Sequence, residues 1–157
     1  MVGHLIIGST GTGKTKFVKS LINKVNPDCV FVYDVQNEYG VGKLGDFEKF
    51  AERATRIKKG LIIFEEATIF LDSRGSNRNL KDVLVSKRHT QNYVVLVFHS
   101  IADVPKYIFR ICTHVTLFKS IDDSNSIKFR HPSLLKAHSF LLTKKKEDFK
   151  HVTFKLY

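Results

Sequence analysis

Eight consecutive residues near the N-terminus have the types and the spacing of a loop that binds phosphate groups. They fit the pattern G-x-x-x-x-G-K-[ST], and in this chain they are Gly8, Ser9, Thr10, Gly11, Thr12, Gly13, Lys14 and Thr15. The glycines let backbone N–H groups turn towards phosphate oxygens, the lysine reaches the outer phosphates, and the last threonine places a hydroxyl on Mg²⁺. The pattern predicts a nucleoside triphosphate site, with ATP and Mg²⁺ as the expected cofactors.

The sequence on both sides of this loop supports that interpretation over an ordinary glycine-rich turn. The apolar residues 5–7 before the loop are typical of a buried strand. After the loop, apolar residues recur with helical spacing from Phe17 to Val25, and Pro27 ends the pattern. A phosphate at the loop would therefore also meet the positive end of a helix.

Two adjacent acids, Glu65 and Glu66, follow the apolar run 61–64 and resemble a Walker B segment. Ligands of open α/β sheets bind where the strands end, so we expect these acids beside the phosphate loop. Neighbouring side chains on a strand point in different directions, and one acid can face the metal while the other faces the outermost phosphate. We assign Glu65 to Mg²⁺, usually through water, and Glu66 to orienting and deprotonating an attacking water. The alternative is a pair of solvated acids at a strand end.

Strand-like and helix-like patterns alternate along the chain. Apolar runs predict strands at 5–7, 29–33, 61–64, 93–98 and 113–118. Helical periodicity or helix-boundary residues predict helices between them, at 17–25, 47–57, 80–89 and near Pro105. This alternation predicts an α/β fold with a mainly parallel central sheet and helices on both faces. A helix at 132–142 and a strand near 152–156 complete the C-terminal part.

Length and charge suggest a single domain with a polyanionic partner. The 157 residues are expected to form one domain, 1–157, with its core at about 3–118 and the helix and strand at 132–157 added to it. Lys and Arg number 26 against 15 Asp and Glu, giving a formal charge of +11. Nucleic acid is the first candidate partner, an anionic membrane surface the second, and plain solubility the remaining explanation.

Apolar runs and cysteines indicate the cellular location that we expect for the protein. We expect no transmembrane segment, because no apolar run approaches the roughly 18 residues that cross a bilayer, and no signal peptide precedes the first strand. A soluble, cytoplasmic protein is the expectation. Cys29 and Cys112 lack metal-binding spacing and are predicted to be reduced and buried.

Four segments resemble the FtsK/HerA superfamily of ring-shaped DNA-pumping ATPases. These are the phosphate loop; the two acids at 65–66; residues 34–39, which resemble D-x-x-x-E-Y; and Lys87-Arg88-His89 with the buried strand that follows. The last feature is most like viral genome-packaging ATPases and Zot-like phage assembly proteins. The resemblance covers about residues 3–118 and implies a three-layer P-loop NTPase fold of the RecA-like (ASCE) type.

The same resemblance implies further site residues. In the superfamily, the fourth strand lies between the phosphate-loop strand and the acidic strand. That order would place His99 and Ser100 between Lys14 and Glu65, with His99 as a sensor of the outermost phosphate. Family members usually carry glutamine there, and the alternative is a neutral histidine satisfied by a backbone group. Glutamate rather than aspartate at position 65 also allows Glu65 and Glu66 to exchange or share roles. Asp34 and Glu38 are expected at the same edge, where they would orient water or contact a neighbouring subunit, with turn-capping as the alternative for Asp34.

Rings of this superfamily complete each site with an arginine from the adjacent subunit. Arg74, Arg78 and Arg88 are candidates, and Arg88 is our choice, with a surface or DNA-phosphate role as the alternative for each. Residues 72–79 are expected to face DNA in the channel of the ring. Lys144, Lys145 and Lys146 are predicted to form a solvated turn, with phosphate contact as the alternative.

The resemblance implies an ATP-hydrolysing DNA translocase, working as a homo-oligomeric ring in viral genome packaging or DNA transfer. It would contact DNA phosphates without sequence preference, with a viral capsid or membrane-associated protein as a further partner. The location would be the cytoplasm of the host, or the virion. The alternatives are a small nucleoside or nucleotide kinase, and a Zot-like NTPase for phage assembly at a membrane.

Overall fold

A six-stranded sheet forms the centre of the computed structural model, which describes residues 2–41, 46–71 and 77–157. Within these ranges the strands lie in the order β2-β3-β4-β1-β5-β6. All neighbours are parallel except β5 and β6, which are antiparallel. The bounds are β1 Val2–Ile7, β2 Val30–Tyr33, β3 Leu61–Phe64, β4 Tyr93–Phe98, β5 His114–Phe118 and β6 His151–Lys155.

The strands in the middle of the sheet are apolar along nearly their whole length because helices cover both of their faces. All four residues of β3 are buried, as are all residues of β1 and β4 after the first. β2 is shorter than the predicted strand at 29–33, and its first two residues are only half-buried because β2 lies at the edge of the sheet. In β6, exposed and half-buried residues alternate, as expected for the opposite edge.

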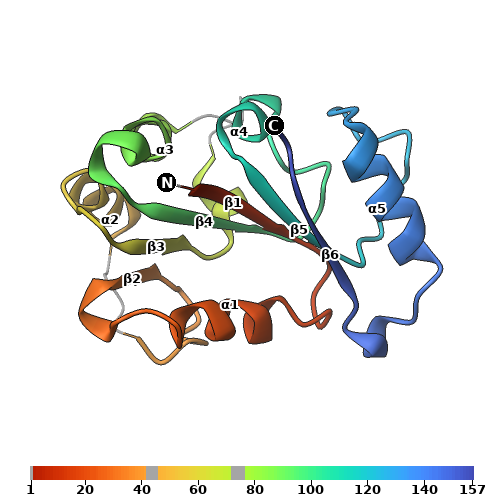
Figure 1. Cartoon of the computed structure of the whole chain (residues 1–157), viewed down its shortest axis with the longest axis horizontal. Coiled ribbons are helices and arrows are strands. Elements are labelled where there is room, and N and C mark those ends of the chain that lie inside the picture. Colours follow the sequence, from red (N-terminus) through yellow and green to blue (C-terminus); the bar gives the residue numbers. More distant parts are fainter. Residues whose placement is uncertain (1, 42–45, 72–76) are drawn as a thin grey trace.

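Helices form a layer on each face of the sheet (Figure 1). One apolar cluster packs α1 against the sheet, and the other contains buried residues of α2, α3, α4 and α5. The helices are α1 Lys14–Ile22, α2 Phe47–Ala54, α3 Arg78–Thr90, α4 Lys106–Ile111 and α5 Pro132–Leu142, with short 3-10 turns η1 Pro27–Cys29, η2 Ala67–Phe70 and η3 Lys146–Asp148. The predicted three-layer α/β fold with a mainly parallel sheet is confirmed.

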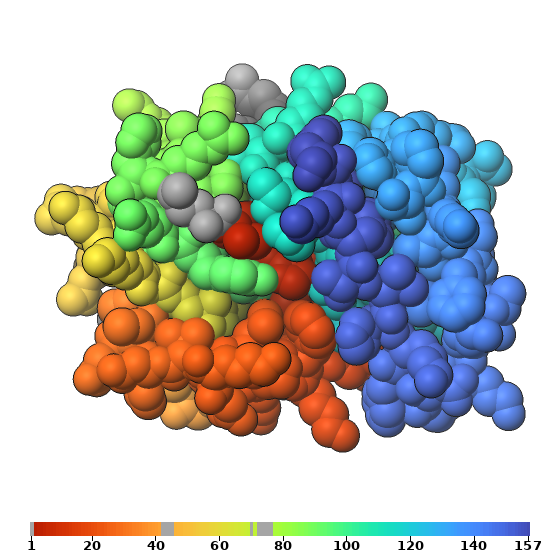
Figure 2. Space-filling model, viewed as in Figure 1, coloured from red at the N-terminus to blue at the C-terminus, as the bar shows by residue number. Residues whose placement is uncertain are grey.

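The segment from α5 to β6 belongs to this same structure. β6 pairs with β5 along five residues, and α5 contributes Leu134 and Leu141 to the larger apolar cluster. Figure 2 shows this blue segment forming one side of the molecule, while little of β1, in red, is visible between its neighbours. None of the described helices has the length and apolar composition to cross a membrane.

The strand order decides which loops meet. β4 lies between β1 and β3, with Ile7 paired to Phe98 and Phe64 paired to Leu96. The phosphate loop after β1, the acids after β3 and His99 after β4 therefore leave the sheet side by side at its carboxyl edge.

His4 is a buried polar residue within β1, and it has two side-chain partners. Its Nδ1 lies 2.7 Å from the Tyr93 hydroxyl, and its Nε2 lies 2.7 Å from Thr116 Oγ1. Burial, and to a smaller extent the nearby His114, lowers the pKa of His4 from 6.5 to about 4. The folded protein therefore holds a neutral imidazole where the unfolded chain would be protonated.

This difference predicts acid sensitivity. Between pH 6.5 and about 4 the unfolded state binds more protons at His4, so the stability present above pH 6.5 is lost as the pH falls through about 4. We expect the free energy of unfolding to drop by about 3 kcal/mol from this residue, as urea denaturation at pH 7 and pH 4 would measure. In His4→Gln, acidification should lower the free energy of unfolding by about 3 kcal/mol less than in the unaltered protein. The control His89→Gln changes an exposed histidine and should show the same acid loss as the unaltered protein. An identical acid loss in His4→Gln would contradict the prediction.

Candidate functional site

The phosphate loop is fixed to the ends of two strands. Gly8 N donates to Phe98 O at 3.1 Å, and Ser9 N donates to Lys119 O at 3.0 Å. A Cβ on Gly8 would lie 2.5 Å from the Cβ of Phe118, so only glycine fits at the start of the loop. The loop is thus held by β4 on one side and by the residue after β5 on the other.

Within the loop, two further glycines adopt left-handed backbone angles, with φ of 76° at Gly11 and 103° at Gly13. Thr12 is buried, and its hydroxyl donates to Ser9 O at 2.7 Å. Ser9 Oγ is itself buried and has no hydrogen-bond partner among the described residues. The Ser9 hydroxyl is thereby left for a ligand in the loop.

Lys14 lies inside the loop, with only 6% of its surface exposed. Its Nζ donates to Gly8 O at 2.6 Å and to Ser9 O at 3.1 Å. Burial lowers the pKa of Lys14, and the carboxylates of Glu65, Glu38 and Glu66 oppose that change. An anion in the loop would favour the charged form of this lysine in the same way.

The turn after β2 carries a carboxylate to Thr15. Asp34 is buried and caps this turn, accepting from Gln36 N at 3.1 Å and from Tyr39 N at 3.0 Å. The turn brings Glu38 Oε2 to the Thr15 hydroxyl, which donates to it at 2.8 Å. Of the two roles considered for Asp34, the structure has turn-capping.

Glu65 is buried beside Tyr39, whose hydroxyl donates to Glu65 Oε2. Burial raises the pKa of Glu65 to about 7, although the Tyr39 hydrogen bond and the charge of Lys14 act to lower it. The carboxylate in hydrogen-bond contact with the Thr15 hydroxyl is that of Glu38. Glu38 thus contacts the threonine that the sequence assigns to the metal, and Glu65 lines the same pocket.

Glu66 diverges from Glu65 because of its backbone. Glu65 N still donates to Tyr33 O at 3.0 Å, continuing the sheet, whereas Glu66 has the left-handed angles φ 50° and ψ 50°. For a residue with a side chain, such angles are uncommon and concentrate at functional sites. The turn of the chain at this residue points the carboxylate towards β4.

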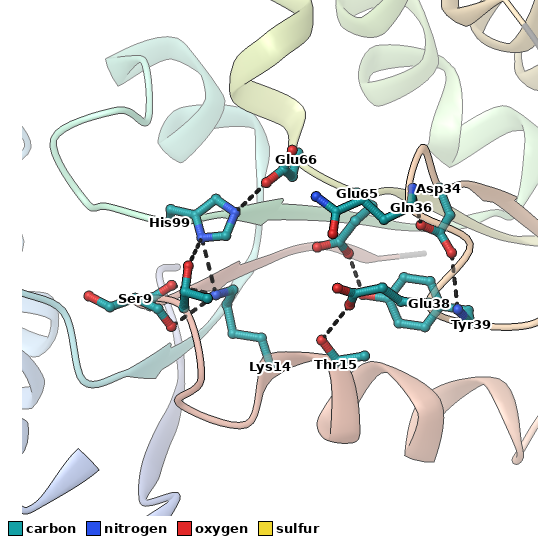
Figure 3. A network of polar contacts seen from close by, with 12 residues as sticks. Ser9, Lys14, Thr15, Asp34, Gln36, Glu38, Tyr39, Glu65, Glu66 and His99 are labelled. Carbon is teal, nitrogen blue, oxygen red and sulfur yellow. Dashed lines mark hydrogen bonds and ion pairs between the residues drawn. The ribbon is translucent and has the colours of Figure 1, made fainter. Parts of the chain in front are cut away.

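His99 joins Glu66 to Lys14 (Figure 3). Its Nε2 lies 2.8 Å from Glu66 Oε1, and its Nδ1 lies 3.4 Å from Lys14 Nζ and 3.4 Å from Thr10 Oγ1. Since an ammonium group only donates, the contacts fit a neutral imidazole that accepts at Nδ1 and donates from Nε2. The resemblance placed His99 between Lys14 and Glu65; its direct acidic partner is Glu66, because Glu65 turns towards Tyr39.

The tip of β4 is held by Asp122, a residue that no sequence pattern indicated. Its carboxylate accepts from Ile101 N at 2.8 Å, from Ala102 N at 3.1 Å and from the Ser100 and Ser120 hydroxyls. Burial acts to raise the pKa of Asp122, but these hydrogen bonds outweigh it and hold the pKa below its usual value. Asp122 follows β5, so it fixes the segment after His99 against the other side of the loop.

Residues of the phosphate loop, of the turn after β2 and of the ends of β3 and β4 line one pocket of about 440 Å³. Phe149, from the segment between η3 and β6, also lines it and was not predicted, since it follows the lysines expected to form a solvated turn. The lining residues are Thr10, Gly11, Gly13, Lys14, Thr15, Lys16, Gln36, Glu38, Glu65, Glu66, His99 and Phe149. Most of the predicted site residues therefore share one pocket.

The residues present fit a magnesium triphosphate. The glycines leave room for phosphate at the backbone, and the hydroxyl of Thr15 with the carboxylates of Glu38 and Glu65 supplies the oxygen ligands that Mg²⁺ prefers. The described part of the chain has no cluster of three or more His, Cys, Asp or Glu residues able to hold a metal. Mg²⁺ in nucleotide sites typically uses one or two carboxylates together with the phosphates of the substrate.

The candidate arginines lie away from this pocket or outside the described residues. Arg74 and most of the 72–79 segment lie outside the described residues. Arg78 is exposed at the first residue of α3. Arg88 is exposed near the other end of α3, where Lys59 N donates to Thr90 O at the amino edge of the sheet. Arg88 therefore does not line the pocket of its own chain, which lies at the carboxyl edge.

Comparison with known proteins gives both a fold and a family. The family model for the central domain of the helicase HerA matches residues 4–148. The genome packaging NTPase B204 from Sulfolobus turreted icosahedral virus 2, solved with AMPPCP, aligns with a TM-score of 0.76 and 13% identity over 99% of this chain and 92% of that chain. The same protein with AMP aligns with a TM-score of 0.75 over the same shares, also at 13% identity.

A more distant match is the cytoplasmic domain of the type VII secretion ATPase EccC from Thermomonospora curvata. It has a TM-score of 0.52 and 9% identity, covering 80% of this chain and 20% of that chain. No curated protein sequence matches significantly. At such identities the structural matches show a shared fold, whereas the family model spans most of the chain. The chain belongs to the family of the HerA helicase central domain, among the FtsK/HerA P-loop ATPases.

Proposed function

We propose that this chain is an ATP-hydrolysing DNA translocase that works as a homo-oligomeric ring in viral genome packaging or DNA transfer. The observation that carries the proposal is the chain of contacts from Lys14 through His99 to Glu66 across one pocket. Membership of an ATPase family supports nucleotide hydrolysis. The likeness in fold to a viral genome packaging NTPase supports the packaging role.

Each residue has a proposed part in hydrolysis. Residues 8–15 hold the triphosphate, and Lys14 neutralises charge on its outer phosphates. Glu66 orients the attacking water and accepts its proton, while His99 donates from Nε2 and fixes the direction of the Glu66 carboxylate. Mg²⁺, when bound, offsets phosphate charge, and Thr15 and Glu65 are its proposed ligands, with Glu38 beside them.

Glu66 is a better candidate for the base than Glu65 in this arrangement. Its carboxylate is about a quarter exposed and lies on His99, next to the lysine that meets the outer phosphates. Glu65 is buried and accepts from Tyr39, and burial raises its pKa to about 7. The exchanged assignment would require Glu65 to leave that hydrogen bond.

The ring supplies the remaining groups. Arg88 of an adjacent copy is the proposed finger that stabilises charge on the transferred phosphoryl group, since in its own chain it lies at the amino edge of the sheet and does not line the pocket. The formal charge of +11 supports binding to DNA through phosphates, with residues 72–79 as the proposed contact. Host cytoplasm or the virion is the proposed location, with a capsid or membrane-associated protein as a recruiting partner.

Lys14→Ala should remove the buried ammonium group and lower ATP turnover by about 100-fold or more. It should also weaken ATP binding, because the loop then lacks its only lysine. Phosphate release and binding of a fluorescent ATP analogue measure the two effects. As a control, Lys19→Ala alters an exposed lysine on α1 and should leave both unchanged. Normal turnover by Lys14→Ala would contradict the role of the loop.

Glu66→Gln should bind ATP normally but hydrolyse it about 100- to 10,000-fold more slowly, because the amide cannot accept the proton. Single-turnover hydrolysis with bound ATP isolates this step. The matched variant Glu65→Gln keeps a group that can accept from Tyr39, and it should act mainly on the Mg²⁺ dependence. If Glu65→Gln blocked hydrolysis and Glu66→Gln did not, the two roles would have to be exchanged.

DNA of arbitrary sequence should stimulate ATP turnover, and the stimulation should fall steeply between about 50 and 200 mM salt because phosphate contacts release counterions. Arg78→Ala should weaken this stimulation and leave turnover without DNA unchanged. Its control is Arg56→Ala, which changes another exposed arginine, paired with Glu52 on α2.

The same assay separates the motor from the kinase alternative. Transfer of phosphate to a nucleoside without release of free phosphate would support a kinase and contradict the proposed function. Turnover that is identical with and without DNA would remove the translocase from the proposal.

A further inference from the structure

Phe149 combines an unusual backbone with an exposed ring at the nucleotide pocket. Its φ is 48°, a left-handed value that is rare for a bulky residue. The residue remains 51% exposed although it lines the pocket. An exposed aromatic ring held at an unfavourable backbone angle is a feature typical of functional positions.

The ring rests directly on the phosphate loop. A Cβ placed on Gly13 would lie 3.2 Å from Phe149 Cδ1, which is closer than ordinary van der Waals contact, so the ring leaves little space beside this glycine. The Nζ of Lys16, the third residue of α1, lies 5.8 Å from the centroid of the ring. Lys146 of η3 approaches Gly11, with its Nζ 3.4 Å from a Cβ placed there. The segment from η3 to β6 therefore covers part of the loop, as its position beside the start of α1 in Figure 1 also shows.

Phe149 and the acids reach the loop from opposite sides. In the sheet, β3 and β4 lie on one side of β1, and β5 and β6 lie on the other. Glu66 and His99 follow β3 and β4, whereas Phe149 precedes β6. A triphosphate whose outermost phosphate meets Glu66 and His99 would extend its ribose and base towards the β6 side.

We propose that Phe149 is the platform on which the nucleobase stacks. The inference rests on the proposed function, because it assumes that residues 8–15 hold the phosphates. Stacking on the ring face uses the π-surface that every base has, so it contributes affinity with little choice between purines. The lysines beside the ring, Lys16 and Lys146, are placed for contact with phosphate or ribose oxygens.

The test compares a ligand that has a base with one that lacks it. Phe149→Ala should weaken ATP binding by about 10-fold, the size expected for the loss of one stacked base, and should leave inorganic tripolyphosphate binding unchanged. Isothermal titration with Mg²⁺ present measures both. Phe149→Tyr should restore ATP affinity.

The chain offers a matched control in Phe140. This phenylalanine is 48% exposed on α5, and Lys144 Nζ lies 4.6 Å from its centroid, but it does not line the nucleotide pocket. Phe140→Ala should leave the affinity for both ligands unchanged. Equal weakening of ATP and tripolyphosphate by Phe149→Ala would overturn the inference, because the ring would then support the loop. No effect on either ligand would overturn it as well.

A spectroscopic test avoids the loss of the aromatic ring. The sequence contains no tryptophan, so Phe149→Trp would carry the sole indole. ATP should quench or shift its emission and tripolyphosphate should not, whereas an equal response to both would contradict stacking. If the unaltered protein bound neither ligand, the proposed function itself would fail, an outcome distinct from a failed stacking test.

Discussion

The insertion of β4 between β1 and β3 is the constraint on which the rest of the site depends. Hydrogen bonding of β4 to both neighbours sets His99 between the phosphate loop and the acids, and Gly8 N is tied to Phe98 O at the end of the same strand. Because parallel strands end at one edge, residues that are far apart in sequence lie close together there. The polar contacts in the pocket follow from this order of strands.

Burial gives two adjacent carboxylates different properties. Glu65 continues the sheet, is enclosed with Tyr39, and has its pKa raised to about 7, whereas Glu66 turns out of the strand through a left-handed backbone and lies on His99. The same pair of residue types thus provides one buried carboxyl group with a raised pKa and one that is positioned by its hydrogen bond to His99. Such separation of neighbouring acids is a common basis for distinct roles within a single site.

Local patterns predicted much of this arrangement, and long-range packing accounts for what they missed. The phosphate loop could be recognised because its function requires glycines and a lysine at fixed spacing, and the apolar runs identified the central strands. The sequence could not identify which carboxylate contacts Thr15, because Glu38 reaches this threonine through the turn that Asp34 caps. The sequence could not predict that Phe149 lines the pocket, since its position there comes from the pairing of β6 with β5 and not from its own neighbours in sequence.

The position of β1 in the middle of the sheet also has a consequence for biosynthesis. Among the described strands β1 is made before the others, and both strands that flank it, β4 and β5, are made much later. Its apolar side chains must therefore remain without their sheet partners until residues 93–118 have been made, and exposed hydrophobic segments are prone to aggregate. Folding that waits for distant pairing is intrinsically slow, so a nascent chain of this kind would benefit from chaperones until β5 has left the exit tunnel.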